Sequence, residues 1–80
     1  MEYELNGVNL IVHLPGELDH HSVRTLPQDI ELLFGEYEIR RIIFDFSAVT
    51  FMDSSGIGAV LERYKRMCGR DGDITLYGMN

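Results

Sequence analysis

Apolar and polar residues alternate at the start of the chain, and this pattern indicates a β-hairpin. Tyr3 and Leu5 alternate with glutamates, and the Asn6-Gly7 pair that follows is a strong signal for a tight turn. Residues 8–14 then carry an apolar side chain at every second position, which predicts a second strand. Pro15-Gly16 is expected to end that strand.

The next segment has the spacing of a helix with one buried stripe. Its apolar positions begin at Val23, Ser22 before them is a candidate N-cap, and Gly35 is a candidate stop. Pro27 lies inside this segment, where a proline removes one helical hydrogen bond and crowds the preceding turn. We therefore expect a helix that either starts later, near Thr25, or carries a kink.

The rest of the chain predicts strand, helix and strand. Residues 41–46 form a compact apolar run with little alternation, which suits a strand covered on both faces of a parallel or mixed sheet. Residues 57–68 have helical spacing, and residues 73–77 indicate another strand. The order strand, strand, helix, strand, helix, strand predicts an α/β fold. A last strand at the sheet edge with no covering helix after it would expose backbone groups and apolar surface. We therefore expect that the domain is truncated after this fourth strand.

Composition limits the classes of function. Eighty residues suit one domain, and a net charge of −6 argues against binding through nucleic-acid phosphates. No apolar run approaches the roughly 20 residues that span a membrane. A single cysteine cannot form an internal disulfide, and the acidic N-terminus lacks the pattern of a signal peptide, so we expect a cytoplasmic protein. No Gly-Lys-Ser/Thr loop is present, so the chain is not expected to bind nucleotide by itself.

The main candidate site is a polar motif between a strand-like run and the second helix. Asp53, Ser54 and Ser55 are followed closely by Gly56 and Gly58. A serine at the positive end of a helix suits a phosphate, and helical geometry places Ser55 roughly 160° from the centre of the buried stripe. We therefore expect Ser55 to face water as a phosphoacceptor, while Ser54 or Asp53 caps the helix. In the alternative interpretation these are ordinary caps and ordinary glycines near a helix start.

A second polar cluster lies between the second strand and the first helix. It contains Asp19, His20, His21 and Ser22. Adjacent histidines rarely converge on one ion and no third ligand is spaced nearby, so we predict no metal site and regard a capping Asp19 or Ser22 as the simpler interpretation. Loops that follow the strands of an α/β sheet tend to gather at one edge, so both polar loops are expected to share one surface.

A hydrolytic serine is the enzymatic alternative. The chain lacks a Gly-x-Ser-x-Gly elbow, and nothing in the sequence fixes His13, His20 or His21 as the partner of a serine. We therefore predict no catalytic residues and a protein that is not an enzyme.

With both clusters in view, the chain resembles the STAS domain family, the anti-sigma factor antagonists. The matching stretches are Gly-Glu-Leu-Asp-His-His at 16–21, Phe-Met-Asp-Ser-Ser-Gly-Ile-Gly at 51–58 and Arg-Tyr-Lys at 63–65. The resemblance covers essentially all 80 residues, which predicts a single STAS domain over 1–80. Asp-Ser-Ser-Gly is its specific part, and Asp-His-His narrows it to the sporulation branch, which acts on the anti-sigma-F factor.

The resemblance implies a mixed sheet with helices packed on it and phosphorylation of Ser55. It also implies a partner that is both an anti-sigma factor and a serine kinase, and a serine phosphatase that reverses the modification. The unphosphorylated antagonist would bind that partner and free the sigma factor, with no cofactor of its own and with nucleotide entering only through the kinase. The implied partner-binding residues are Asp19, His20, His21, Asp53, Ser54, Ser55, Gly56 and Gly58.

The chain departs from the family pattern in two places. Pro27 lies in the first helix, and the helix, strand and final helix with which family members usually continue are missing. An alternative role is a structural STAS module of a larger regulatory assembly or transporter.

Overall fold

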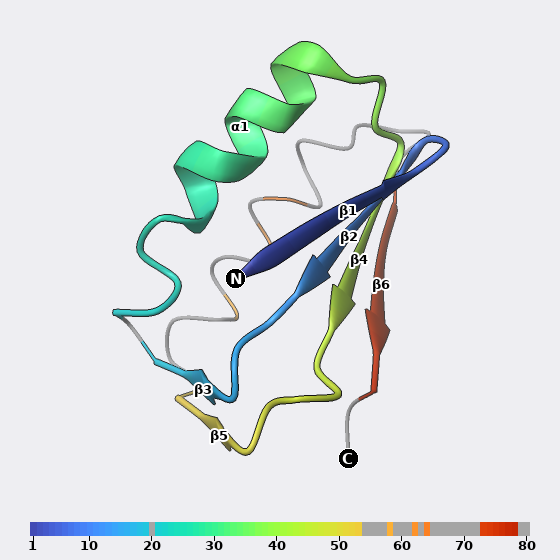
Figure 1. Cartoon of the computed structure of the whole chain (residues 1–80). Coiled ribbons are helices and arrows are strands. Elements are labelled where there is room, and N and C mark those ends of the chain that lie inside the picture. Colours follow the sequence, from blue (N-terminus) through green and yellow to red (C-terminus); the bar gives the residue numbers. More distant parts are fainter. Residues whose placement is uncertain (20, 54–57, 59–61, 63, 65–72, 79–80) are drawn as a thin grey trace.

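A mixed sheet forms the centre of the fold (Figure 1). The structure is a computed structural model that describes residues 1–19, 21–53, 58, 62, 64 and 73–78. Within them the sheet has the order β1 (Glu2–Asn6), β2 (Asn9–His13), β4 (Arg41–Asp45) and β6 (Asp73–Tyr77). β2, β4 and β6 are parallel and β1 is antiparallel to β2, which confirms the predicted mixed sheet.

The opening hairpin is confirmed. β1 and β2 pair with Tyr3 opposite Val12, and two residues, Gly7 and Val8, connect the strands. Gly7 has a φ of 63°, whereas Val8 has a negative φ. A positive φ at the first residue of a two-residue loop fits a type II′ turn, whose twist matches that of the paired strands. The glycine of the Asn6-Gly7 pair therefore fixes the register of the hairpin.

Helix α1 (Leu26–Glu36) decides between the two expectations for Pro27. The helix starts later, with Thr25 as its N-cap and Pro27 in the first turn, where a missing N–H costs no hydrogen bond. The candidate N-cap Ser22 was wrong, because this residue lies in the preceding turn. Gly35 was also wrong as a stop, since it lacks the positive φ with which a glycine ends a helix and α1 continues past it.

One face of the sheet packs against α1 and forms the core (Figure 1). Its fully buried side chains come from alternate positions of β2 and β4 and from α1: Leu10, Val12, Ile42, Phe44, Leu26 and Ile30. Tyr64, which is helical, adds a buried ring 6.2 Å from the ring of Phe44. Gly58 and Glu62 are helical too, and the other residues of the predicted second helix lie outside the described residues.

The expectation that β4 is covered on both faces was wrong. Ile42 and Phe44 are fully buried, but Ile43 and Asp45 point to the opposite face and are only half-buried. That face also carries Ile11 and His13 of β2, both half-buried. The apolar run of β4 therefore reflects β-branched residues that favour strands, in addition to burial on the helix side.

Candidate functional site

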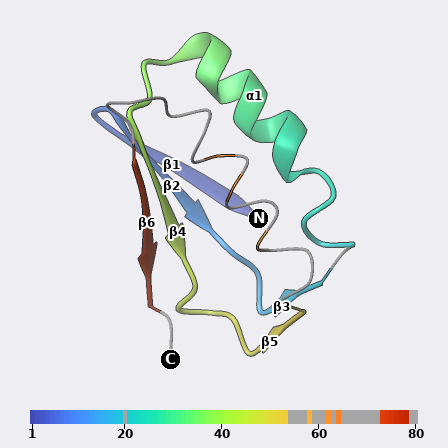
Figure 2. The ribbon, with the colours of Figure 1, turned by 180° about the vertical axis from the view of Figure 1, so that it is seen from behind.

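A short parallel ladder brings the two polar loops together. β3 (Glu17–Leu18) pairs with β5 (Phe51–Met52), separately from the main sheet. The backbone N–H of Asp53 extends this ladder by donating to the carbonyl of Leu18 at 2.9 Å. Because the strands are parallel, the chain leaves both at the same end, and Figures 1 and 2 show the two strands side by side. Asp19 follows β3 and Asp53 follows β5, as expected of loops that share one surface.

The backbone ahead of this ladder is held by the carbonyl of Gly16. It accepts hydrogen bonds from the backbone N–H of Thr50 at 2.7 Å and of Phe51 at 3.1 Å, and from Thr50 Oγ1 at 3.2 Å. Three donors on one acceptor fix β5 against the segment that precedes β3. The position at which the second polar loop begins is therefore fixed by hydrogen bonds between residues that are far apart in the sequence.

Asp19 and Ser22 close the first polar loop on itself. The Ser22 N–H donates to Asp19 Oδ1 at 2.8 Å, the Asp19 N–H donates to Ser22 Oγ at 2.9 Å, and Ser22 Oγ donates to the Asp19 carbonyl at 3.1 Å. The bond from the Ser22 backbone lowers the pKa of the Asp19 carboxyl below its ordinary value, because it favours the charged form. The two residues thus cap a turn before α1, and they hold an ionised acid in the loop.

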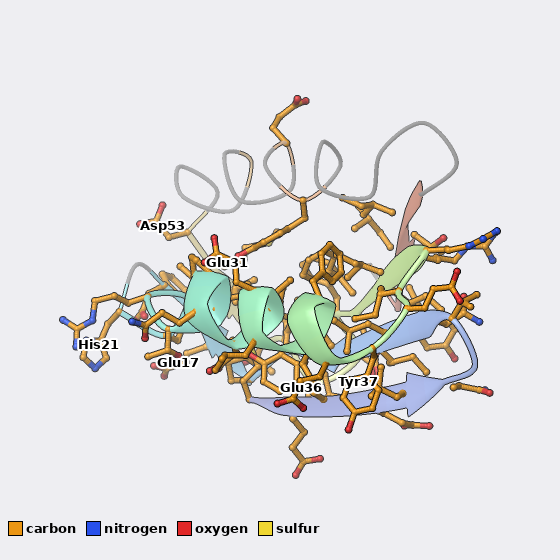
Figure 3. All side chains as sticks on the ribbon, turned by 90° about the horizontal axis from the view of Figure 1, so that it is seen from above. Glu17, His21, Glu31, Glu36, Tyr37 and Asp53 are labelled. Atoms are coloured by element: carbon orange, nitrogen blue, oxygen red, sulfur yellow. The ribbon has the colours of Figure 1, made fainter. Side chains whose placement is uncertain are left out.

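His21 and Asp53 lie at the same end of the molecule in Figure 3, and both are exposed. His20, Ser54, Ser55 and Gly56 lie outside the described residues. The exposure of Ser55 and the cap by Ser54 or Asp53 therefore stay predictions.

Gly58 is helical and exposed. Among the described residues no atom lies within 4 Å of the position that a Cβ would occupy there. A close approach of another described segment therefore does not account for this glycine, and its implied role in partner binding stays a prediction.

A charged cluster that was not predicted from the sequence lies on the face of the sheet opposite α1. His13 Nδ1 lies 2.9 Å from Asp45 Oδ2, and His13 Nε2 lies 3.1 Å from Glu4 Oε1. Hydrogen bonds to Glu4 and then to Asp45 raise the pKa of His13 above 6.5. The pKa of Asp45 is lowered, first by its bonds to Ser47 and then by His13. Only the strand register, which sets residues 32 positions apart side by side, could have revealed this cluster.

The described part of the chain has neither a candidate metal site nor a membrane-spanning helix. No three side chains of histidine, cysteine, aspartate or glutamate gather there in a way that could hold a metal ion. No helix of that part has the length and apolar character needed to cross a membrane.

The chain is similar to proteins of known role. It is 34% identical over 80 residues to an anti-sigma F factor antagonist of Paenibacillus polymyxa, covering all of this chain and 68% of that protein. It is also 34% identical over 70 residues to an anti-sigma F factor antagonist of Lysinibacillus sphaericus, covering 84% of this chain and 60% of the relative. The chain thus spans about two thirds of the length of these relatives.

Solved structures agree with this similarity. The anti-sigma factor antagonist SpoIIAA in its unphosphorylated form superposes with a TM-score of 0.73 at 32% identity, over 91% of this chain and 64% of that one. The Bacillus cell fate determinant SpoIIAA in the phosphorylated form superposes with a TM-score of 0.70 at 32% identity, over 91% and 67% of the two chains. The profile of the STAS domain matches residues 1–80. A match over the whole length, together with the same mixed sheet, shows that this chain belongs to the STAS domain family.

Proposed function

We propose that this chain is an anti-sigma factor antagonist controlled by phosphorylation of Ser55. In its unphosphorylated form it binds an anti-sigma factor that is also a serine kinase, and this binding releases the sigma factor. The kinase inactivates the antagonist with ATP, and a serine phosphatase restores it. The chain performs no catalysis in this cycle and acts in the cytoplasm.

The observation that carries the proposal is the pairing of β3 with β5. This ladder starts the two polar loops side by side, so Asp19, His21 and Asp53 belong to one end of the molecule. Two similar proteins are named anti-sigma F factor antagonists, and SpoIIAA has been solved in both phosphorylation states. These features support the proposal that a kinase binds this surface and phosphorylates it.

The charge of a phosphate on Ser55 would switch partner binding off. A phosphate on Ser55 adds roughly −1.5 to −2 charges and three acceptor oxygens. It would lie two positions from the exposed Asp53, in a chain whose net charge is already −6. A bulky, strongly hydrated group at that place opposes close packing of the partner, while the core formed with α1 is left unchanged. The phosphate therefore acts on the interface and spares the fold.

The experiment is to incubate the chain with the anti-sigma kinase of the same organism and ATP and to map phosphate by mass spectrometry. Phosphate is expected on Ser55 and is expected to be absent in Ser55→Ala, which should still bind the kinase. Ser55→Asp should weaken binding by roughly tenfold or more, which corresponds to about 1.4 kcal/mol.

Asn9→Asp is the matched control. It adds the same single charge at the start of β2, at the end of the sheet opposite β3 (Figure 1). Equal weakening by Asn9→Asp and Ser55→Asp would show an effect of net charge alone. Phosphate on another residue, or full affinity of Ser55→Asp, would refute the assigned switch.

A further inference from the structure

β5 presents a large aromatic side chain to solvent beside the candidate site. Phe51 is 58% exposed and lies opposite Glu17 of β3, which is also exposed. Its neighbour Met52 lies opposite Leu18, which is fully buried. Successive side chains of a strand point to opposite sides, so Phe51 and Glu17 share the outward side. On the other side Leu18 is buried, whereas Met52 stays 38% exposed.

The fold itself does not use most of the Phe51 side chain. An aromatic residue can bury about 150–250 Å², so a side chain left more than half exposed keeps on the order of 100 Å² of apolar surface in water. The backbone beneath it is nevertheless fixed, because the N–H groups of Phe51 and Thr50 both donate to Gly16. A rigid backbone that carries an exposed aromatic ring loses little entropy when a partner binds.

Acidic residues surround this apolar position. Glu17 lies opposite Phe51 on the outward side of the ladder, and the exposed Asp53 follows Phe51 two positions later in the chain. An aromatic centre with a polar rim is the usual composition of an energetically dominant contact in a protein interface. The acids further require that the partner offer positive charge around the pocket that takes the ring.

We propose that Phe51 is the apolar anchor of this surface, with Met52 at its border. The Phe51 ring would enter an apolar pocket on the anti-sigma kinase, and lysine or arginine side chains would border that pocket. This inference rests on the proposed function and deepens it, since the regulatory serine would lie four positions from the anchor in the sequence. The anchor supplies affinity in the unphosphorylated state, and phosphate four positions along the chain opposes seating of the same pocket.

The test compares Phe51→Ser with Tyr37→Ser in titrations against the anti-sigma kinase of the same organism. Tyr37 is a matched control, because it is an aromatic side chain of similar exposure, 49%, at the far end of α1 in Figure 3. Phe51→Ser is expected to weaken binding at least tenfold, and Tyr37→Ser less than twofold. Thermal melts by circular dichroism should show all three proteins folded, and Phe51→Leu should recover most of the affinity if Phe51→Ser melts early.

The salt dependence of binding distinguishes the apolar contact of Phe51 from the charged contact of Asp53. The loss caused by Phe51→Ser should stay constant as salt rises, whereas the loss caused by Asp53→Asn should shrink, because exposed charges are screened. If the wild-type chain fails to bind the kinase, both the proposed function and the role of Phe51 as an anchor are refuted. If wild type binds and Phe51→Ser binds as tightly as Tyr37→Ser, the anchor alone is refuted. Sedimentation that reveals a dimer lost in Phe51→Ser, with unchanged kinase affinity, would assign the patch to a second copy and overturn the proposal.

Discussion

The cluster of His13, Glu4 and Asp45 predicts a pH-dependent contribution to stability. Both partners of the imidazole are carboxylates, which accept hydrogen bonds and cannot donate them when ionised. A neutral imidazole has one N–H and can satisfy one of them, so both contacts require the imidazolium form. Replacing His13 by glutamine removes this charge, and its effect on stability should therefore depend on pH.

The contacts set the size of the effect. Glu4 is 58% exposed, Asp45 is 16% exposed and His13 is 36% exposed, so the pair with Asp45 is the less screened of the two. Ion pairs of this kind contribute roughly 0.2–1 kcal/mol each, so the two together are expected to contribute about 1 kcal/mol. The pKa of His13 is raised, so this contribution is complete below the unfolded value of 6.5 and is lost as pH rises through the folded pKa. The lowered pKa of Asp45 sets the acid limit, since its contribution is lost as pH falls through the folded value.

The assay is urea denaturation of wild type and His13→Gln at about pH 5.5 and about pH 8.5, in low salt. The free-energy difference between the two proteins is expected to be larger by about 1 kcal/mol at the lower pH. Glu36→Gln removes a charge at the end of α1, far from the cluster, and serves as the control. NMR titration of His13 should give a pKa above 6.5. A difference that grows with pH, or a titration midpoint below that value, would refute the reasoning.

Two further predictions concern the fold. Gly78→Ala should destabilise the chain by on the order of 3 kcal/mol in urea denaturation, because the residue has a φ of 76° and a Cβ there would lie 2.8 Å from the Ser47 nitrogen. Gly7→Ala, with a φ of 63° and nothing within 4 Å, should cost only about 1–2 kcal/mol, so equal losses would contradict the steric argument. Tyr3→Phe should cost about 1 kcal/mol, because it removes a hydroxyl that donates to Asp29 Oδ2 at 2.8 Å, and a variant as stable as wild type would rule this contribution out. Burial raises the pKa of Tyr3, which keeps that hydroxyl protonated as a donor.

Local elements were predictable where backbone preference acts over a few residues. The Asn6-Gly7 turn was correctly located because a positive φ is cheap only for glycine. Pro27 limited the first helix to a late start or a kink, and the structure has the late start, with the proline in the first turn. The ends of α1 were misjudged at Ser22 and Gly35, because the serine bonds to Asp19 and the glycine keeps a negative φ. Caps depend on which side-chain and backbone bonds compete, and spacing does not reveal that competition.

The candidate site also has features that the sequence predicted and features that it did not. The two polar loops and their residue types were visible in the sequence, and so was the expectation that they share a surface. The ladder that joins them was not, because β3 and β5 are two residues long and carry too little pattern for recognition. The outward position of Phe51 was hidden for the same reason, since the side of a strand is fixed only once its partner is known.

By itself the sequence determined the hairpin, the presence of the first helix, the strands of the main sheet and the family, because these depend on periodicity, on glycine and proline, and on short motifs. Tertiary structure decided which distant residues meet: Gly16 with Thr50, 34 positions apart, and His13 with Asp45, 32 positions apart. Such contacts follow from strand register, which the burial of one whole face selects cooperatively. The exposed aromatic ring of β5 and the charged cluster of the open sheet face are consequences of that register.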